Sequence, residues 1–376
     1  MTRPISLARP ALALEDLQGV HAVLASGQLV QAGQVAGFEQ ALSRVLDDAH
    51  VVAVSSGTAA LHVALLALDA LPGAEVVVPA FTFPAVANVV WLAGLTPRLV
   101  DVSLDDYGPD ADEVLAALGP RTAAVIWVHQ LGNVPADAAV LREVAGRVPL
   151  IEDAACSLGA RIDGRASGTL GRLGCTSFHP RKIVTTGEGG AVFTHDADLA
   201  RRLRELRNHG QAEGEAGFLR FERPGLNARL SELHAAIGRS QLASLGYFLE
   251  KRRVLGRRYV ERLAGVPGVT VPAAYREGRA NFQGLAVLLD EGLDRDALMA
   301  ALRERRIETT IGGYSIPHQP AYVRRFGPPG DRFPNAERAF RHALALPLHP
   351  GLDEADVDTV VASLADGIAH QGEVHA

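Results

Sequence analysis

Residues 176 to 192 read Thr-Ser-Phe-His-Pro-Arg-Lys-Ile-Val-Thr-Thr-Gly-Glu-Gly-Gly-Ala-Val and place Lys182 in a loop between two apolar segments. Of the 37 lysine and arginine residues, only Lys182 and Lys251 are lysine. A lysine in a partly desolvated site can lose its proton and attack a carbonyl carbon to form a Schiff base, which an arginine cannot do. Lys251 lies in Glu-Lys-Arg-Arg, a pattern typical of a solvated helix face. The loop around Lys182 is therefore a candidate for chemistry.

Short apolar runs alternate with helical patterns on both sides of this loop. The runs that predict strands are residues 51–54, 75–78, 99–102, 123–128 and 148–152. Between the first two runs, Leu61, Leu65 and Leu68 recur at helical spacing. Strands that are apolar on both faces and separated by helices indicate an α/β fold with a mainly parallel sheet covered by helices.

This alternation predicts a large domain over residues 15–245. The texture then changes to an arginine-rich amphipathic helix over 248–263, a loop rich in Gly and Pro over 326–334, and a final helix with Val357, Val361 and Leu364 on one face. We expect residues 246–376 to form a smaller α+β C-terminal domain. The N-terminal arm, residues 1–14, is expected to pack with that domain or with a dimer partner.

The composition excludes several classes of protein. A net charge of −6 without a basic block argues against a nucleic-acid partner, and 48% hydrophobic residues argue against disorder. The uncharged stretches 51–68 and 76–97 contain polar residues and prolines, so they predict buried strand–helix units rather than membrane spans. Two cysteines make no disulfide framework, and no secretory pattern begins the chain. We expect a soluble cytoplasmic protein without a metal site.

The stretch Val-Ser-Ser-Gly-Thr-Ala-Ala-Leu, residues 54 to 61, predicts a strand that runs directly into a helix. The free N–H groups and the dipole at such a helix start can bind an anion, and Gly57 allows a phosphate to approach closely. The pattern is weak alone, because such turns are common. It is neither a P-loop nor the glycine fingerprint of a nicotinamide-dependent dehydrogenase.

A second candidate is Pro-Leu-Ile-Glu-Asp-Ala-Ala-Cys, residues 149 to 156, in which Glu152 and Asp153 end a buried strand. Ligands of open α/β sheets bind at this edge. One of the two carboxylates can be explained as a helix N-cap, whereas two together favour a binding role.

The lysine, the carboxylate and the anion site together fit pyridoxal 5′-phosphate (PLP), which needs all three. The chain resembles the DegT/DnrJ/StrS family of PLP-dependent aminotransferases, which act on nucleotide-linked keto-sugars and have the aspartate-aminotransferase-like fold type I. The motifs that carry the resemblance extend over nearly the whole chain. They are Ser-Gly-Gln-Leu-Val-Gln-Ala-Gly (26–33), Ser-Ser-Gly-Thr-Ala-Ala-Leu-His (55–62), Val-Pro-Ala-Phe-Thr-Phe-Pro-Ala-Val-Ala-Asn (78–88), Glu-Asp-Ala-Ala (152–155), the Lys182 loop, Arg-Asn-His-Gly (207–210), Gly-Leu-Asn-Ala-Arg-Leu (225–230) and His-Gln-Pro-Ala-Tyr (318–322).

The resemblance implies roles for individual residues. Lys182 is the Schiff-base lysine and proton carrier, and Asp153 is the partner of the ring nitrogen. The other residues implied to contact the cofactor are Gly57, Thr58, Ala59 and Ser177 at the phosphate, Phe83 on the ring face, Cys156 beside the ring, and Asn227 at the cofactor of the neighbouring subunit. Arg229 and His318 are implied to contact the substrate.

Plain structural explanations compete with some of these roles. Phe83 could be core packing, Ser177 a strand-end cap and Asn227 a turn residue. Arg229 could hold its own loop, and His318 could cap a turn beside proline.

The chain also departs from the family pattern at three places. Cys156 stands where many members have Gln or His, the segment 128–135 differs by one residue from the usual His-x-x-Gly-x-Pro spacing, and the stretch 311–318 is compact.

The implied activity is transfer of an amino group from glutamate or glutamine to a keto-sugar on a nucleoside diphosphate, by a homodimer with shared active sites that alternates between PLP and pyridoxamine phosphate (PMP). An aminocyclitol aminotransferase shares every cofactor motif and is the main alternative. A PLP-dependent sugar dehydratase is disfavoured because that group resembles histidine at the position of Lys182. A non-catalytic PLP-binding regulator is disfavoured because no DNA-binding helix pair or basic extension is present.

Overall fold

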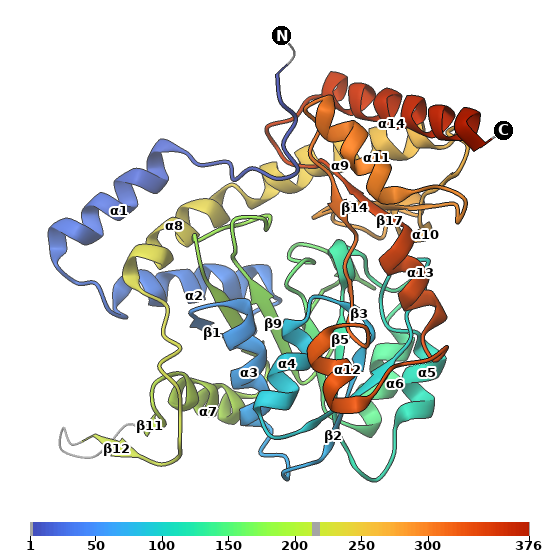
Figure 1. Cartoon of the computed structure of the whole chain (residues 1–376). Helices are drawn as coiled ribbons and strands as arrows, with labels where there is room; N and C mark the ends of the chain where they lie inside the picture. The colour runs from blue at the N-terminus through green and yellow to red at the C-terminus, as the bar shows by residue number, and fades with distance from the viewer. Residues whose placement is uncertain (1–2, 213–218, 376) are drawn as a thin grey trace.

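The computed structural model describes residues 3–212 and 219–375 (Figure 1). Its central sheet has the strand order β1-β10-β9-β6-β5-β2-β4. β10 is antiparallel to both of its neighbours, and the other adjacent strands are parallel. The carboxyl ends of all strands except β10 therefore meet at one edge, where β10 begins. The bounds are β1 (His50–Val54), β2 (Glu75–Pro79), β4 (Thr96–Val100), β5 (Thr122–Val128), β6 (Leu150–Asp153), β9 (Leu173–Ser177) and β10 (Gly190–Thr194).

Helices cover both faces of this sheet, as the apolar strands predict. Alternate side chains of a strand point to opposite faces. On β1, Val52 and Val54 pack with α3, α4 and α7, while Val51 and Ala53 pack on the side of α2 and α8; α5 and α6 cover the rest of that second face. The bounds are α2 (Gly33–Val45), α3 (Gly57–Ala67), α4 (Ala85–Leu92), α5 (Ala111–Ala117), α6 (Ala139–Arg147), α7 (Ala197–Arg207) and α8 (Glu232–Ala243).

Two strand predictions are displaced along the chain. The strand expected at 99–102 is β4, which starts at Thr96 because it pairs in register with β2 from Glu75. Asp101 follows it and accepts the amides of Asn335 and Ala336 at 2.9 and 2.7 Å, which takes the chain out of the sheet. The strand expected at 148–152 is β6, which starts at Leu150 after α6 and Pro149.

A second, antiparallel sheet lies in the C-terminal part of the chain, in the order β13-β14-β17-β15. Its apolar core includes Val357, Val361 and Leu364 of the last helix, as their shared face predicts. Ile5 is buried in the same core and forms a parallel bridge with Ile307. The bounds are α9 (Leu245–Leu263), β13 (Val269–Thr270), α10 (Ala273–Arg276), β14 (Leu285–Leu289), α11 (Arg295–Glu304), β15 (Thr310–Ile311), β17 (Ala343–Leu346) and α14 (Glu354–His375).

The domain boundary at about residue 245 stays a prediction; α9 begins at this point. β3, which follows β2 of the large sheet, pairs with β16 of the C-terminal part and forms a separate two-stranded sheet. The remaining elements are β3 (Phe81–Thr82), the 3₁₀ turn η1 (Gln130–Gly132), β7 (Arg161–Ile162), β8 (Arg165–Ala166), β11 (Gln211–Ala212), β12 (Arg220–Phe221), α12 (Pro320–Phe326), β16 (Tyr314–Ser315) and α13 (Pro334–His342).

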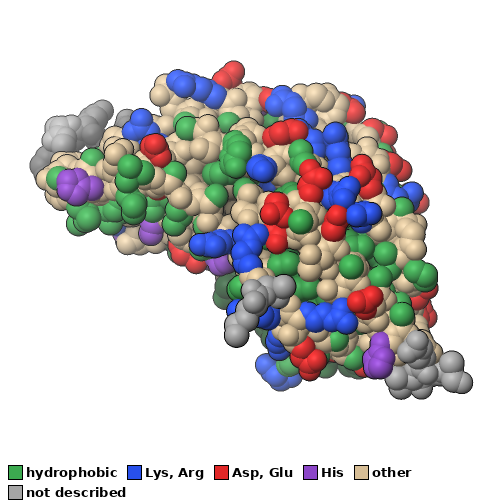
Figure 2. Space-filling view, turned by 90° about the horizontal axis from the view of Figure 1, so that it is seen from above, with side chains coloured by type: hydrophobic (Ala, Val, Ile, Leu, Met, Phe, Trp, Pro, Cys, Tyr) green, Lys and Arg blue, Asp and Glu red, His purple; other side chains and the backbone are tan. Residues whose placement is uncertain are grey.

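Helix α1 (Leu14–Ser26) lies against α8 at one end of the molecule (Figure 1). Leu14, Leu17 and Leu24 on this helix are 64%, 66% and 59% exposed. Hydrophobic side chains gather at this end of the molecule in Figure 2. Among the described residues, no helix combines the length and the apolar character needed to cross a bilayer.

Arg252 ties α9 to two other segments of the C-terminal part. Its side chain is buried and donates through Nη1 to the carbonyl oxygens of Phe282, Gln283 and Leu348 at 3.2, 3.0 and 2.8 Å. Burial lowers the pKa of the guanidinium to about 10. The neighbouring Lys251 is only half-buried.

We expect Arg252→Lys to lower the free energy of unfolding by about 2 kcal/mol, because an ammonium group at that depth leaves buried carbonyl groups unpaired. Lys251→Arg, one residue away, should change it by less than about 0.5 kcal/mol. Urea denaturation of the two variants measures both values. Equal losses in the two variants would contradict the role given to Arg252.

Candidate active site

Lys182 lies in the connection between β9 and β10, at the carboxyl edge of the central sheet. Its amide donates to the carbonyl oxygen of His179 at 2.8 Å, which curls the chain directly after β9. Its Nζ donates to Sγ of Cys156 at 3.0 Å. Burial lowers the pKa of Lys182, but Cys156 and Asp153 outweigh it, so that the pKa of the free amine is raised. The raised pKa opposes the loss of a proton that the sequence analysis expects of a lysine in a partly desolvated site.

Asp153 is the last residue of β6 and is 6% exposed. Burial raises the pKa of its carboxyl, against the lowering effects of the Ala155 amide, Lys182 and His129. The Ala155 amide donates to Oδ1 at 3.0 Å, which leaves Oδ2 available for another partner. The buried carboxylate and the Lys182 amine therefore lie at the same edge of the sheet, and each shifts the pKa of the other.

Glu152, one residue earlier, has a different surrounding. Its fully buried carboxylate accepts the amides of Gly168, Leu170 and Gly171 at 3.0, 2.7 and 2.7 Å. It also lies 2.9 Å from Nε2 of the buried His129. Residues 155–159 form turns, so neither carboxylate caps a helix there. Glu152 thus fastens the loop before β9, and Asp153 is the carboxylate that faces Lys182.

The N-terminus of α3 forms a cradle with the end of β9. A Cβ added to Gly57 would lie 2.7 Å from Cβ and 3.1 Å from Oγ of Ser177, so only glycine leaves room between them. The first amides of a helix have no acceptor within it, and the dipole there favours an anion. The amide of Ala59 is already bound by the Ser56 hydroxyl at 3.0 Å. Gly57, Thr58 and Ser177 therefore fit a phosphate group, while the Ala59 amide does not contribute a free donor.

The Ser177 hydroxyl also accepts the His179 amide, at a long 3.4 Å. This weak contact is the cap that the plain explanation of Ser177 expects, and it leaves the hydroxyl proton free to donate. Gly190 pairs with both Ser177 and Val54. The end of β9 and the end of β1, which leads into α3, therefore lie on either side of the start of β10.

Phe83 follows β3 and is 63% exposed, which excludes core packing as its role. Its ring meets the ring of Tyr314 edge to face, with the centroids 6.0 Å apart. Thr82, beside it, lies 3.3 Å from Gln130 Oε1, and Gln130 Nε2 lies 3.4 Å from the carbonyl oxygen of Gly312. Phe83 thus presents an open aromatic face on a backbone held by buried polar contacts.

The other candidates lie on the segments that border this edge. Asn227 is exposed, and its backbone forms a bridge with Asn208. Arg229 donates to the Asn208 side chain, so it holds its loop. His318 Nδ1 lies 2.7 Å from the Ser315 hydroxyl and stiffens the turn after β16. Substrate contacts by Arg229 and His318 stay predictions.

Sequence reasoning missed His129 and the Ser56 cap. The one-residue departure at 128–135 was the available signal for the first. His129 is followed directly by η1, where Leu131 and Gly132 have φ of 58° and 89°. The signal for the second was a serine directly before Gly-Thr-Ala, the pattern of an N-cap.

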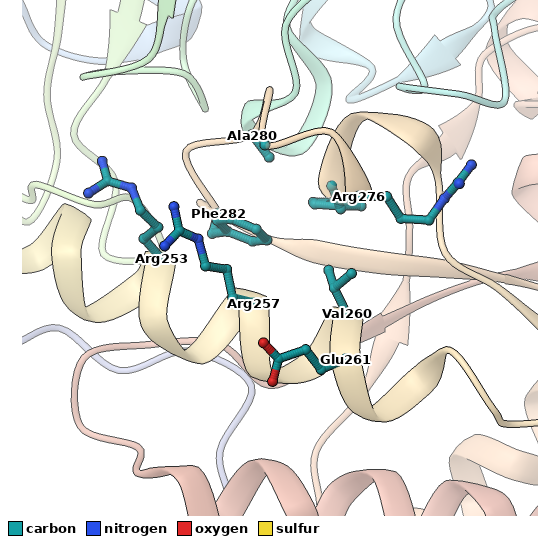
Figure 3. A pocket seen from close by; sticks show the side chains of 9 residues that line it. Arg253, Arg257, Val260, Glu261, Arg276, Ala280 and Phe282 are labelled. Atoms are coloured by element: carbon teal, nitrogen blue, oxygen red, sulfur yellow. The ribbon is translucent and has the colours of Figure 1, made fainter.

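A separate cavity of about 300 Å³ lies between α9, α10 and residues 278–282. Figure 3 shows Arg253 and Arg257 extending from α9 beside Phe282, with Arg276 on the opposite wall. Asn281, between the lining residues Ala280 and Phe282, donates instead to the carbonyl oxygen of Cys156 at 2.9 Å. The residues that line the cavity come from α9, α10 and the segment after α10, whereas the cradle at Gly57 and Ser177 lies on α3 and β9.

A lysine and a buried carboxylate beside an anion cradle, at the carboxyl edge of a mainly parallel sheet, define a PLP-dependent enzyme of fold type I. Within that class, the chain belongs to the DegT/DnrJ/EryC1/StrS aminotransferase family, whose model matches residues 10–365. The fold, the cofactor and the aminotransferase class predicted from the sequence are confirmed.

Solved structures support this assignment along the whole chain. The aminotransferase TlmJ from Streptoalloteichus hindustanus is 34% identical, with a TM-score of 0.89, over 97% of this chain and 99% of that one. DesV of S. venezuelae, in complex with a ketimine intermediate, is 33% identical, with a TM-score of 0.88, over 97% and 98%. DesI, in the presence of its TDP-sugar product, is 33% identical, with a TM-score of 0.89, over 100% and 96%.

We expect Gly57→Ala to raise the dissociation constant for PLP about tenfold or more, because the added methyl group displaces Ser177 from the cradle. Gly246→Ala, with open space around its Cα, serves as the control and should bind PLP normally. Fluorescence titration of the apoenzymes measures both constants. Normal PLP affinity in the Gly57→Ala variant would contradict the assignment of the phosphate to this cradle.

Proposed function

We propose that this enzyme transfers an amino group from glutamate or glutamine to a keto-sugar carried by a nucleoside diphosphate. The observation that carries the proposal is the meeting of Lys182, Asp153 and the Gly57–Ser177 cradle in a chain that is 33% identical to DesI. The structure of DesI was determined with its TDP-sugar product. We also place the reaction in the cytoplasm, since Cys156 and Cys175 are both free.

The bound cofactor supplies an electron sink and a carrier for the amino group. Gly57, Thr58 and Ser177 bind its phosphate, and Phe83 covers one face of its ring. Asp153, buried and with Oδ2 available, holds the proton on the ring nitrogen. Lys182 Nζ would hold the cofactor covalently. Once released, it would move a proton between the donor's carbon atom and the cofactor in the first half-reaction, and between the cofactor and the acceptor's carbon atom in the second.

We further propose that two copies of the chain form a homodimer with shared sites. Asn227 is exposed at the end of the sheet and reaches the cofactor phosphate of the partner. The exposed leucines of α1 supply an apolar face for the second copy, because contiguous apolar surface of this kind marks an interaction site. Sedimentation of the holoenzyme measures the assembly.

The substrate class is tested by supplying glutamate or glutamine with a panel of nucleotide-linked keto-sugars and, in parallel, keto-inositols. We expect amine transfer to at least one keto-sugar nucleotide and none to the keto-inositols, as followed by mass spectrometry of the product. Activity confined to keto-inositols would make the protein an aminocyclitol aminotransferase. PLP bound without conversion to PMP by any amino donor would favour a non-catalytic regulator.

Lys182→Ala should abolish both the visible absorbance of the lysine-bound cofactor and the half-reaction with the amino donor. Lys182→Arg is the matched variant, because it keeps the positive charge near Asp153 but cannot form a Schiff base. If both variants kept the visible absorbance or the half-reaction, Lys182 would not be the lysine that bonds the cofactor.

Asp153→Asn should keep part of the bound PLP but lose at least about 100-fold in turnover, because a neutral amide does not hold the ring proton. Glu143→Gln, which alters only an exposed pair with Arg147, is its control. Steady-state kinetics measures the difference, and near-normal turnover of the Asp153 variant would refute its role.

A further inference from the structure

The contact between Cys156 and Lys182 involves a residue at which the chain departs from the family pattern, since many members have Gln or His at the position of Cys156. Cys156 is half-buried in the turn after β6, with its Sγ 3.0 Å from Lys182 Nζ. The sulfur therefore occupies the position of a hydrogen-bond acceptor for the amine that carries the chemistry. Cys175, by contrast, is fully buried in β9.

One segment of the chain fixes the backbone on both sides of this contact. The side chain of Asn281 donates to the carbonyl oxygens of Cys156 and Leu158 at 2.9 and 3.0 Å. Two residues later, Gln283 donates to the carbonyl oxygen of Arg181, next to Lys182, at 2.6 Å. The distance between sulfur and amine is therefore set by residues 281–283 and not only by the two side chains.

Residues 281–283 are themselves held in place by α9. Arg252 donates to the carbonyl oxygens of Phe282 and Gln283. Phe282 is buried in a left-handed conformation with φ of 57°, which a phenylalanine adopts only when its surroundings impose it. The segment is thus a rigid support and keeps Cys156 and Lys182 in register.

Several titratable groups lie around the amine. Asp153 and Arg181 act on Lys182 with opposite signs, Lys182 contributes to lowering the pKa of His179, and Tyr275 interacts with Cys156. Burial lowers the pKa of the Lys182 amine, whereas Cys156 and Asp153 raise it. Of these two, Cys156 is the one within hydrogen-bond distance of Nζ.

We propose that Cys156 is a positioning residue for Lys182, and that its sulfur holds the ε-amino group at the stages when the lysine is neither bonded to the cofactor nor moving a proton. Those stages are the cofactor-free protein and the interval between the two half-reactions. The inference rests on the proposed function only in taking Lys182 as the lysine that bonds PLP. Held in this way, the amine stays at one place and returns to the same carbon at the end of each cycle.

The test is the rate at which apoenzyme captures PLP, followed by the visible absorbance of the Schiff base as the C=N bond forms and water leaves. In Cys156→Ala the maximal rate should fall about tenfold, because the amine is no longer aimed. The midpoint of the pH–rate profile should move to lower pH, because burial remains while one stabilising acceptor is lost. Cys156→Ser, which keeps an acceptor, should restore both quantities toward those of the wild-type protein.

Cys175→Ala removes the other thiol and should leave the profile unchanged. If Cys156→Ala does not fold by circular dichroism, Cys156→Val replaces it, because valine fills a similar volume without an acceptor. An alanine or valine variant with the wild-type rate and midpoint would overturn the proposal. Failure of the wild-type chain to form a Schiff base would instead count against the proposed function, since Lys182 would then not be the cofactor lysine.

Discussion

The candidate site depends on the buried carboxylate of Asp153 and the partly buried amine of Lys182, which lie at the carboxyl edge of the central sheet and shift each other's pKa. A buried charge is costly without a partner. Lys182 lowers the pKa of Asp153 and Asp153 raises the pKa of Lys182, each against the effect of burial. The antiparallel β10 makes this arrangement possible: β9 ends at this edge and β10 begins there, so the lysine loop between them stays at the edge. The loop that contains the lysine is thereby anchored at both of its ends, by β9 and by β10.

Much of the architecture could be predicted from residue patterns. The apolar strands and the spacing of Leu61 and Leu65 predict a covered parallel sheet. For Lys182, Asp153 and Gly57, the sequence predicts that they lie at the carboxyl edge of this sheet, and the structure places them there. Their roles stay predictions; they could be proposed from the sequence because the chemistry assigned to them admits few other residue types. Strand bounds were less predictable, because pairing register and acidic caps such as Asp101 decide where a strand ends.

The remaining features could not be predicted because they depend on contacts between distant segments. Nothing local indicates that Phe83, in an apolar run, is exposed, or that Arg229 is held by Asn208. The backbone on the two sides of the contact between Cys156 and Lys182 is held by Asn281, which is 125 residues from Cys156, and by Gln283, which is 102 residues from Arg181. From the sequence, Cys156 indicates only the loss of the Gln or His side chain that many family members have. Its contact with Lys182 is found only in the folded structure.

Glu152 and Asp153 are consecutive, yet they serve opposite faces of β6. Glu152 binds three amides of the loop before β9, and Asp153 faces the lysine. Successive side chains of a strand alternate in direction, so displacement of β6 by one residue would exchange the two carboxylates. Such a slip would leave the composition of the site unaltered while destroying both its anchor and its chemistry. The two carboxylates therefore reach their separate partners only when β6 has its native register in the sheet, so the geometry of the candidate site depends on that register.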